Sequence, residues 1–217
     1  INGTESNREF IYHNVTNTTG YYSSSVFAGQ TITFTLFRNE TTIETASDVV
    51  QLSAGFYNYT YYTDGNNNYT SAKKQFNLTI QKASPILDLT ISPSATVTYP
   101  TITTASCTAN TNQVTPQLFR NGSSATNPEI ILLGAKTYEY LCNNTATQNY
   151  TSNSTSIILT IDRGPTEIAL YLNETRENKD YTANKIANFT SQLNISGKII
   201  YLTSNMTGFG TITNTSS

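Results

Sequence analysis

The sequence is poor in charged residues and contains no long apolar run. Of its 217 residues only 12% are charged, 37% are hydrophobic, and tryptophan is absent. The formal net charge of −2, with Lys and Arg scattered along the chain, excludes the basic surface expected of a nucleic-acid-binding protein or a polybasic membrane anchor. Because no run of about 18 apolar residues occurs, the sequence predicts no segment that spans a membrane.

Residues that usually carry chemistry are also scarce. His13 is the single histidine, the carboxylates are dispersed, and the eleven glycines form no phosphate-binding loop. No Ser–His–Asp set and no multi-histidine metal site can be assembled from them. The segment 64–68 carries side-chain oxygens at alternate positions, as calcium loops do, but Asp, Gly and Asn are also the ordinary residues of a turn. We therefore expect no enzymatic activity and no cofactor.

The chain is instead rich in N-x-S/T sequons, the acceptor sites of N-linked glycans. Their density exceeds what ordinary contents of Asn, Ser and Thr supply. Because such sites receive glycan outside the cytoplasm, we expect an extracellular or cell-surface glycoprotein. The sixteen sequons begin at Asn2, Asn14, Asn17, Asn39, Asn58, Asn68, Asn77, Asn121, Asn143, Asn149, Asn153, Asn173, Asn188, Asn194, Asn205 and Asn214.

Four blocks of sequence recur at offsets of 81 or 82 residues, which indicates an internal repeat. A fixed period of this size predicts tandem structural units, each with its own small core. The paired blocks are Leu36–Asn39 and Leu118–Asn121, Tyr57–Tyr59 and Tyr138–Tyr140, Asn68–Ser71 and Asn149–Ser152, and Phe76–Ile80 and Ile157–Ile161.

Within each repeat, short segments alternate apolar and polar residues and are separated by turn residues. This pattern predicts six or seven short strands and no helix, so we expect an all-β fold of tandem β-sandwiches. The period places unit one at residues 1–83, unit two at 84–164 and a partial unit three at 165–217.

The two cysteines connect unit two to a known fold. An even pair in a secreted chain favours a disulfide, and Tyr140 stands two residues before Cys142, the tyrosine-corner spacing of immunoglobulin domains. On these residues unit two resembles the immunoglobulin-like fold, which implies Cys107 on strand B and Cys142 on strand F. The chain departs from antibody-type domains because strand C has no Trp. In unit one Val26 and Tyr61 align with the cysteines, so we expect packing alone to hold that core.

Longer motifs resemble the tandem immunoglobulin-like repeats of large microbial cell-surface glycoproteins, particularly archaeal ones. The motifs are the LFRN block, the AGFYNYT and GAKTYEYL strands, the NYTS turn, and the LTIQKASP and LTIDRGP linkers. They cover roughly two-thirds of the chain. Surface layers, filaments and adhesin stalks all use such modules. From the resemblance we expect a structural subunit of an extracellular filament or surface sheath, with copies of itself as partner and covalent N-glycans on its surface.

The two ends of the chain allow two interpretations. Unit three stops 53 residues after residue 164, and Phe10–Tyr12 followed by Tyr22 repeats the spacing of a later strand and turn. Residues 1–24 could therefore complete the third unit of a neighbouring subunit by strand donation, which would build a fibre. The subunit contact would then include Phe10, Tyr12, Tyr22, Ile199 and Tyr201.

In the other interpretation, residues 8–30 form the first strands of unit one, and the third unit is cut by a boundary within a longer repeat protein. The sequence lacks an initiating Met and a signal peptide, which both a mature chain and a fragment would explain. A different function also stays open. The chain could be the stalk of an adhesin that binds glycan or protein through exposed tyrosines. The candidate tyrosines are Tyr57, Tyr59, Tyr61, Tyr62 and Tyr69.

Overall fold

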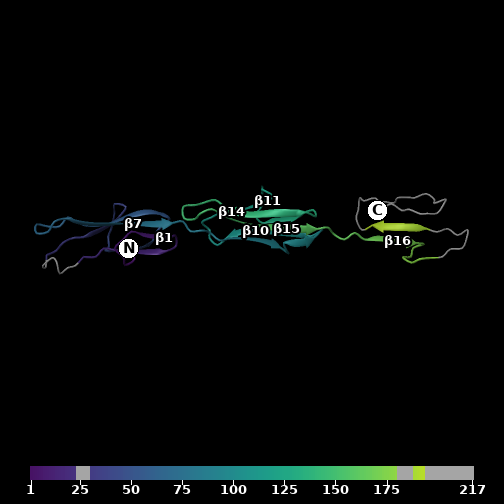
Figure 1. Ribbon diagram of the computed structural model, residues 1–217, viewed down its shortest axis with the longest axis horizontal. Coiled ribbons are helices and arrows are strands. Elements are labelled where there is room, and N and C mark those ends of the chain that lie inside the picture. Colours follow the sequence, from purple (N-terminus) through teal and green to yellow (C-terminus); the bar gives the residue numbers. More distant parts are fainter. Residues whose placement is uncertain (23–29, 180–187, 194–217) are drawn as a thin grey trace. The chain divides into compact units, whose positions relative to one another are not determined.

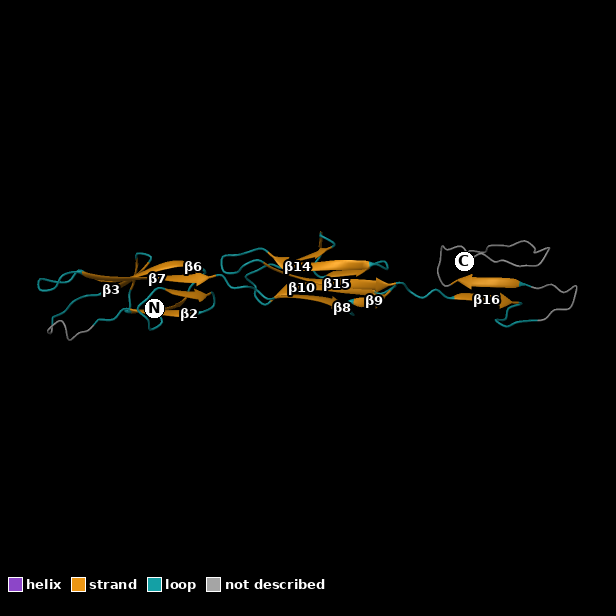
Figure 2. Ribbon diagram, in the orientation of Figure 1, coloured by secondary structure: helices purple, strands orange, loops and turns teal. Residues whose placement is uncertain are grey.

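The structure is a computed structural model that describes residues 1–22, 30–179 and 188–193 (Figure 1). The regular elements within these residues are β-strands (Figure 2), and nothing in them forms a helix able to cross a membrane. By its internal contacts the chain divides into two compact units, Ile1–Asp162 and Arg163–Ser217. The first unit contains two β-sandwiches, and the described part of the second contains a pair of strands.

The second sandwich of the first unit consists of two sheets around one core (Figures 1 and 2). Its strands are antiparallel to their neighbours except β9, which pairs in parallel with β15. One sheet has the order β13–β10–β8, formed by Glu129–Leu132, Ile102–Ala109 and Leu87–Ser92. The other has the order β12–β11–β14–β15–β9, formed by Ser123–Ala125, Gln117–Arg120, Thr137–Asn144, Asn153–Asp162 and Thr96–Thr98.

The first sandwich repeats this arrangement with seven strands. Its larger sheet has the order β1–β7–β6–β3–β4, formed by Arg8–Ile11, Ala72–Gln81, Gly55–Thr63, Thr35–Arg38 and Thr41–Ile43. Its smaller sheet pairs β2, Val15–Thr19, with β5, Ser47–Gln51. Strands β1 to β7 take the places of β9 to β15 in order, including the parallel pairing of β1 with β7. The described residues contain no counterpart of β8, and Ile1 stands where β8 ends.

Each sandwich buries the inner faces of its two sheets in a separate core. Alternate residues of the last strand point inward: Leu78 and Leu159 have no exposed surface, and Ile80 and Ile161 are 3% exposed. These pairs lie 81 residues apart, so the sequence period is the period of the cores. Two facing sheets in this strand order form an immunoglobulin-like sandwich. The prediction of an all-β, immunoglobulin-like fold is confirmed.

Residues 1–19 lie in the first sandwich of their own chain. Strand β1 pairs with β7, and β2 pairs with β5. This segment thus supplies strands to unit one of its own chain, as one of the two interpretations of the N-terminus predicts. Phe10 lies on β1, which takes the place of β9, whereas Tyr57–Tyr59 lie on β6, which takes the place of β14. Spacing between aromatic residues did not distinguish these two strands.

The second compact unit is described in part. Strand β16, Ile168–Leu172, pairs antiparallel with β17, Phe189–Leu193. Two apolar side chains of β16, Ile168 and Leu170, are 62% and 53% exposed. The later residues predicted for unit three, Ile199 and Tyr201 among them, lie outside the described residues.

The disulfide that the resemblance implies is present. Cys107 on β10 and Cys142 on β14 are bonded and join the two sheets of the second sandwich, 35 residues apart in sequence. Both are almost completely buried in the core. Since the bond closes a loop of this length, the chain-entropy model assigns it about 4 kcal/mol.

We predict that the double variant Cys107→Ala/Cys142→Ala destabilises the second sandwich by about 4 kcal/mol and leaves the first unchanged. Native-state hydrogen exchange measures this directly, with the amides of Leu159 and Leu78 as matched probes of the two cores. Equal loss of protection at both residues, or at neither, would contradict the assignment of the bond to one core.

In the first sandwich Gly20 takes the place of Cys107. Each smaller sheet carries one of two corresponding acidic residues: Asp48 lies on β5 and Glu129 on β13. Asp48 lies opposite Thr18, and Gly20 follows Thr18 by two residues. Glu129 lies opposite Ala105, and Cys107 follows Ala105 by two residues. By the register of the facing strands, Tyr61 corresponds to the other cysteine.

The missing side chain of Gly20 makes room for the Tyr61 ring. A Cβ built on Gly20 would lie 2.2 Å from Cε2 of that ring. The Tyr61 ring also stacks on Phe34 at 5.3 Å between centroids, and Phe34 stacks on Tyr22 at 4.4 Å, so a shift of the ring would disturb this stack. Val26, which the sequence period aligned with Cys107, lies outside the described residues. The strand register aligns Gly20 with Cys107. Packing of a ring against a glycine thus occupies the place of the disulfide.

We predict that Gly20→Ala destabilises the first sandwich by about 1–3 kcal/mol through overpacking. The matched control is Gly134→Ala, because a Cβ there would have no atom within 4 Å, and its effect should stay within about 0.5 kcal/mol. Urea unfolding followed by circular dichroism compares the two variants. Similar effects of both would show that Gly20 is not a close-packed position.

Candidate functional site

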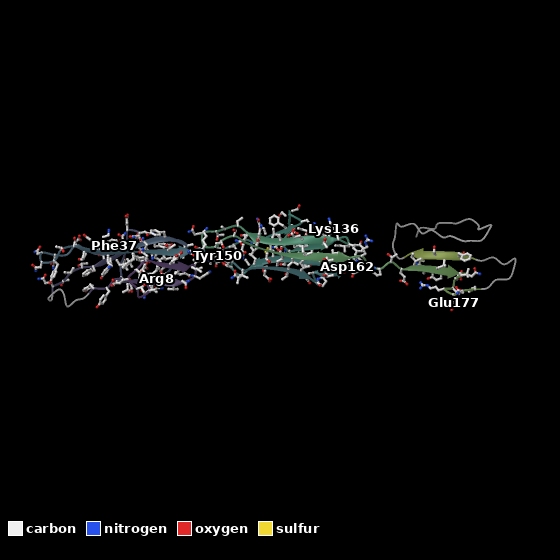
Figure 3. All side chains as sticks on the ribbon, in the orientation of Figure 1. Arg8, Phe37, Lys136, Tyr150, Asp162 and Glu177 are labelled. Carbon is white, nitrogen blue, oxygen red and sulfur yellow. A yellow bond between two sulfur atoms is a disulfide. The ribbon has the colours of Figure 1, made fainter. Side chains whose placement is uncertain are left out.

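The described residues contain no group of three or more His, Cys, Asp or Glu side chains placed to hold a metal ion. The features with functional meaning are the sequons, the contact between the two sandwiches, and a buried polar cluster inside each of them. Figure 3 shows the side chains of the described residues.

Thirteen of the sixteen sequon asparagines lie among the described residues, and none of the thirteen is buried. Their side chains are therefore within reach of solvent, as a glycan requires. The exposed ones are Asn2, Asn14, Asn17, Asn39, Asn68, Asn121, Asn153 and Asn188, and the half-buried ones are Asn58, Asn77, Asn143, Asn149 and Asn173. The remaining three, Asn194, Asn205 and Asn214, lie outside the described residues.

Four sequons share one turn geometry. In each, the asparagine and the next residue both have positive φ, as the central residues of a type I′ hairpin turn do. The asparagine Oδ1 accepts a backbone N–H from the facing strand at 2.6–2.9 Å. This bond uses the oxygen, so a glycan on Nδ2 does not compete with it. The four are Asn2 (φ 46°), Asn39 (46°), Asn121 (48°) and Asn173 (46°).

Two other sequons compete with each other. Asn58 and Asn77 lie directly opposite across β6 and β7, and Asn58 Nδ2 donates to Asn77 Oδ1 at 2.8 Å. Side chains opposite each other on neighbouring strands have Cβ atoms only about 5 Å apart. Two bulky glycans cannot both start there without breaking the amide pair, so we expect at most one of these sites to be occupied in a given chain.

The connection between β14 and β15 is hydrogen-bonded to the first sandwich. Asn149 Oδ1 accepts the backbone N–H of Ala54 at 3.0 Å, and Gln148 Nε2 donates to the carbonyl of Ala54 at 2.6 Å. Ala83, in the segment between the sandwiches, forms a β-bridge with Tyr150, which Figure 3 labels. We call this set of contacts, centred on Asn149 and Tyr150, the joint.

A small apolar cluster lies inside the joint. Tyr150 is 3% exposed and packs with Ala83 and Val114. The Tyr150 ring meets the Tyr12 ring edge-on at 5.7 Å, and its hydroxyl forms a short hydrogen bond with His13 Nε2. The single histidine is exposed and contacts the second sandwich through Tyr150.

A carboxylate lies between the two sheets of each sandwich, half-buried in the first and buried in the second. In the first, Asp48 of the smaller sheet accepts a hydrogen bond from the Tyr59 hydroxyl at 2.6 Å and pairs with Arg38 at 2.6 Å; both partners lie on the larger sheet. We call this arrangement the carboxylate clamp. It spans the sandwich from sheet to sheet.

The second sandwich contains the same clamp. The Tyr140 hydroxyl donates to Glu129 at 2.6 Å, and Arg120 lies 3.4 Å from the other carboxylate oxygen. Tyr140 has the sequence spacing of a tyrosine corner, but its hydroxyl bonds this carboxylate on the facing sheet. The three residues match those of the first sandwich at offsets of 81 or 82, and sequence analysis did not identify them as a set. The signal was weak because Asp48 is replaced by a glutamate.

Burial raises the pKa of both clamp tyrosines, and the hydrogen bond to the carboxylate raises it further. The pKa of Tyr59 is raised to about 12 by burial first and then by its bond to Asp48. Burial and the bond to Glu129 likewise raise the pKa of Tyr140. Both hydroxyls therefore keep their protons, and can donate to the carboxylates, well above neutral pH.

We predict that Tyr59→Phe lowers the free energy of unfolding at neutral pH by about 2 kcal/mol, since it removes a hydrogen bond to a charged group. The folded chain holds the phenol proton more tightly than the unfolded chain. The contribution of this proton is therefore complete below pH 10 and is lost as pH rises to about 12. Urea titrations across this window should show a steeper loss of stability for the original chain than for the variant. Parallel pH profiles would contradict this account of Tyr59.

A hollow of about 410 Å³ opens on the first sandwich. Its lining includes Ile1, Gly20, Leu36, Tyr61 and Phe76. In the second sandwich, Leu89 of β8 lies at the corresponding position, opposite Cys107 and in the core. The hollow therefore coincides with the place that β8 fills in the other repeat.

The predicted subunit-contact residues do not form one surface in the described structure. Phe10 packs against the first core, Tyr12 lies at the joint, and Tyr22 stacks within the first sandwich. Ile199 and Tyr201 lie outside the described residues. A contact of these residues with another subunit stays a prediction.

No protein-family model matches the chain, and no curated protein matches it. Solved structures resemble it at low similarity. Fibronectin(III)-like modules of Clostridium thermocellum CbhA are 12% identical over 74% of this chain and 92% of theirs, with a TM-score of 0.30. Murine CEACAM1b is 18% identical over 54% of this chain and 64% of its own (TM-score 0.27). The N-terminal eight Ig domains of Down Syndrome Cell Adhesion Molecule are 14% identical over 87% of this chain and 35% of that chain, with a TM-score of 0.28.

The class of the protein follows from its own geometry. The strand order, the disulfide between facing sheets and the two separate cores define an all-β protein built from immunoglobulin-like sandwiches.

Proposed function

We propose that this chain is a structural glycoprotein of an extracellular filament or surface sheath, in which copies of the chain associate head to tail. The observation that carries the proposal is the joint. Successive sandwiches with a flexible linker would be independent domains, whereas here hydrogen bonds and a buried tyrosine fix one sandwich to the next. A chain of modules fixed in this way can transmit force along its length.

The sequons support an extracellular location. The four turn asparagines present their side chains at hairpin turns in a geometry compatible with a glycan, and the disulfide suits an oxidising compartment. Glycans on the strands and turns would shield a surface rich in hydroxyl groups from proteases. The resemblance of the repeat motifs to archaeal surface glycoproteins favours a microbial cell surface.

Donation of residues 1–24 to a neighbour is not part of this proposal. Strands β1 and β2 are paired within their own sandwich, and β1 packs Phe10 on its core. Removing them to serve a neighbour would break pairings already made. The exposed apolar residues Ile168 and Leu170 on β16 are better candidates for a contact between subunits.

The alternative is an adhesin stalk that binds glycan or protein through its tyrosine rings. Of the candidate tyrosines, Tyr59 is buried in the first core, whereas Tyr57, Tyr61, Tyr62 and Tyr69 are half-buried. Binding at these rings would make the chain a recognition module.

We predict that the purified full chain forms polymers, seen by negative-stain electron microscopy and by sedimentation. The double variant Ile168→Asn/Leu170→Asn should shift the population to monomers, because it removes the exposed apolar surface of β16. The matched control Ile130→Asn removes a comparably exposed isoleucine, 68% exposed, from β13 and should still polymerise. Monomers from every chain would reject the filament proposal, and glycan-array binding would then support the adhesin.

A further inference from the structure

The joint contains a sequon whose asparagine side-chain amide already forms hydrogen bonds. Asn149 is followed by Tyr150, Thr151 and Ser152, so the sequence makes it a potential N-glycosylation site. The same four residues occur once more, at Asn68–Ser71, where the asparagine is exposed at the connection between β6 and β7. The two sites have identical local sequence and different surroundings.

Both ends of the Asn149 amide make hydrogen bonds. Oδ1 accepts from the Ala54 N–H at 3.0 Å, and Nδ2 donates to Gln113 Oε1 at 2.8 Å. Gln113 in turn donates through Nε2 to the Tyr12 hydroxyl at 2.9 Å. The amide therefore links the second sandwich to the first directly through Ala54 and indirectly through Tyr12.

N-glycosylation would act on the atom that makes one of these bonds. A bond forms between Nδ2 and the anomeric carbon of a glycan held on a phosphate-linked carrier. The bond from that carbon to the carrier phosphate breaks, and Nδ2 loses one proton. The amide keeps a single N–H, and the sugar must occupy space next to Nδ2, where Gln113 lies at 2.8 Å.

We propose that Asn149 is a latch of the joint, and that a glycan on Asn149 and a closed joint exclude one another. With Asn149 unmodified, the two sandwiches are fixed to each other. The Oδ1 bond to Ala54 does not involve Nδ2, so the exclusion follows from the sugar, which would take the place of Gln113 and break its bond to Tyr12. A chain modified at Asn149 therefore has an open joint. The modification state of this one sequon thus sets the stiffness of the chain.

The inference rests on the proposed function because it requires that the chain is glycosylated. The glycan occupancy of Asn68 tests this requirement separately. Glycopeptide mapping should find Asn68 occupied and Asn149 empty in molecules with a closed joint. A glycan on Asn149 in such molecules would overturn the inference. If Asn68 and every other sequon were empty, the proposal of a glycoprotein would fail, while the latch would be decided by the following experiment.

Tryptic cleavage after Lys82 reports the state of the joint. The Ala83 N–H donates to the Asn149 carbonyl, and the Ala83 carbonyl accepts from the Thr151 N–H, each at 2.9 Å. These bonds hold the scissile segment against the second sandwich while the joint is closed. Cleavage therefore requires opening, and its rate follows the population of the open state.

In unglycosylated full-length protein, Asn149→Gln should be cleaved after Lys82 about tenfold faster than the original chain, since two hydrogen bonds are lost. The matched variant Asn68→Gln should be cleaved at the original rate. Gln148→Ala, which removes the other bond to Ala54, should also accelerate cleavage. Unchanged far-UV circular dichroism would show that the sandwiches themselves stay folded. Equal rates for all chains would overturn the latch.

Discussion

In each sandwich one carboxylate ties the two sheets together, half-buried Asp48 in the first and buried Glu129 in the second. Asp48 and Glu129 lie on the smaller sheets, and their tyrosine and arginine partners come from the larger sheets. A carboxylate shielded in this way that loses its partners destabilises the fold, because its charge is then left without hydrogen bonds. The facing sheets must therefore keep one register and one separation. In a chain with no tryptophan and only 37% hydrophobic residues, this polar constraint complements modest apolar cores.

The two repeats keep the clamp and differ in the second connection between their sheets. The second sandwich uses the Cys107–Cys142 bond, while the first places the Tyr61 ring over Gly20. The disulfide and the ring packing act on different states of the chain. A disulfide chiefly restricts the unfolded chain, whereas ring packing stabilises only the folded one. The first sandwich should therefore be the more sensitive of the two to small changes in shape.

The sequence period predicted the fold class well, because repeated strands carry repeated cores. It failed where the repeats differ in length. Strand β3 lies 82 residues before β11, but Gly20 lies 87 residues before Cys107, so the segment after β2 is five residues longer than its counterpart. A fixed offset therefore selected Val26 in place of Gly20. The role of Asn149 was also beyond sequence reasoning, since a sequon does not reveal whether its amide is bonded across the fold.

The joint fixes the two sandwiches to each other, and each clamp ties together the two sheets of one sandwich. The central claim is that the protein is glycosylated in its native setting. Intact-mass spectrometry of protein from its natural source, before and after deglycosylation, tests this most directly. We expect deglycosylation to lower the native mass by the mass of several glycans. A native mass that deglycosylation leaves unchanged would contradict this claim.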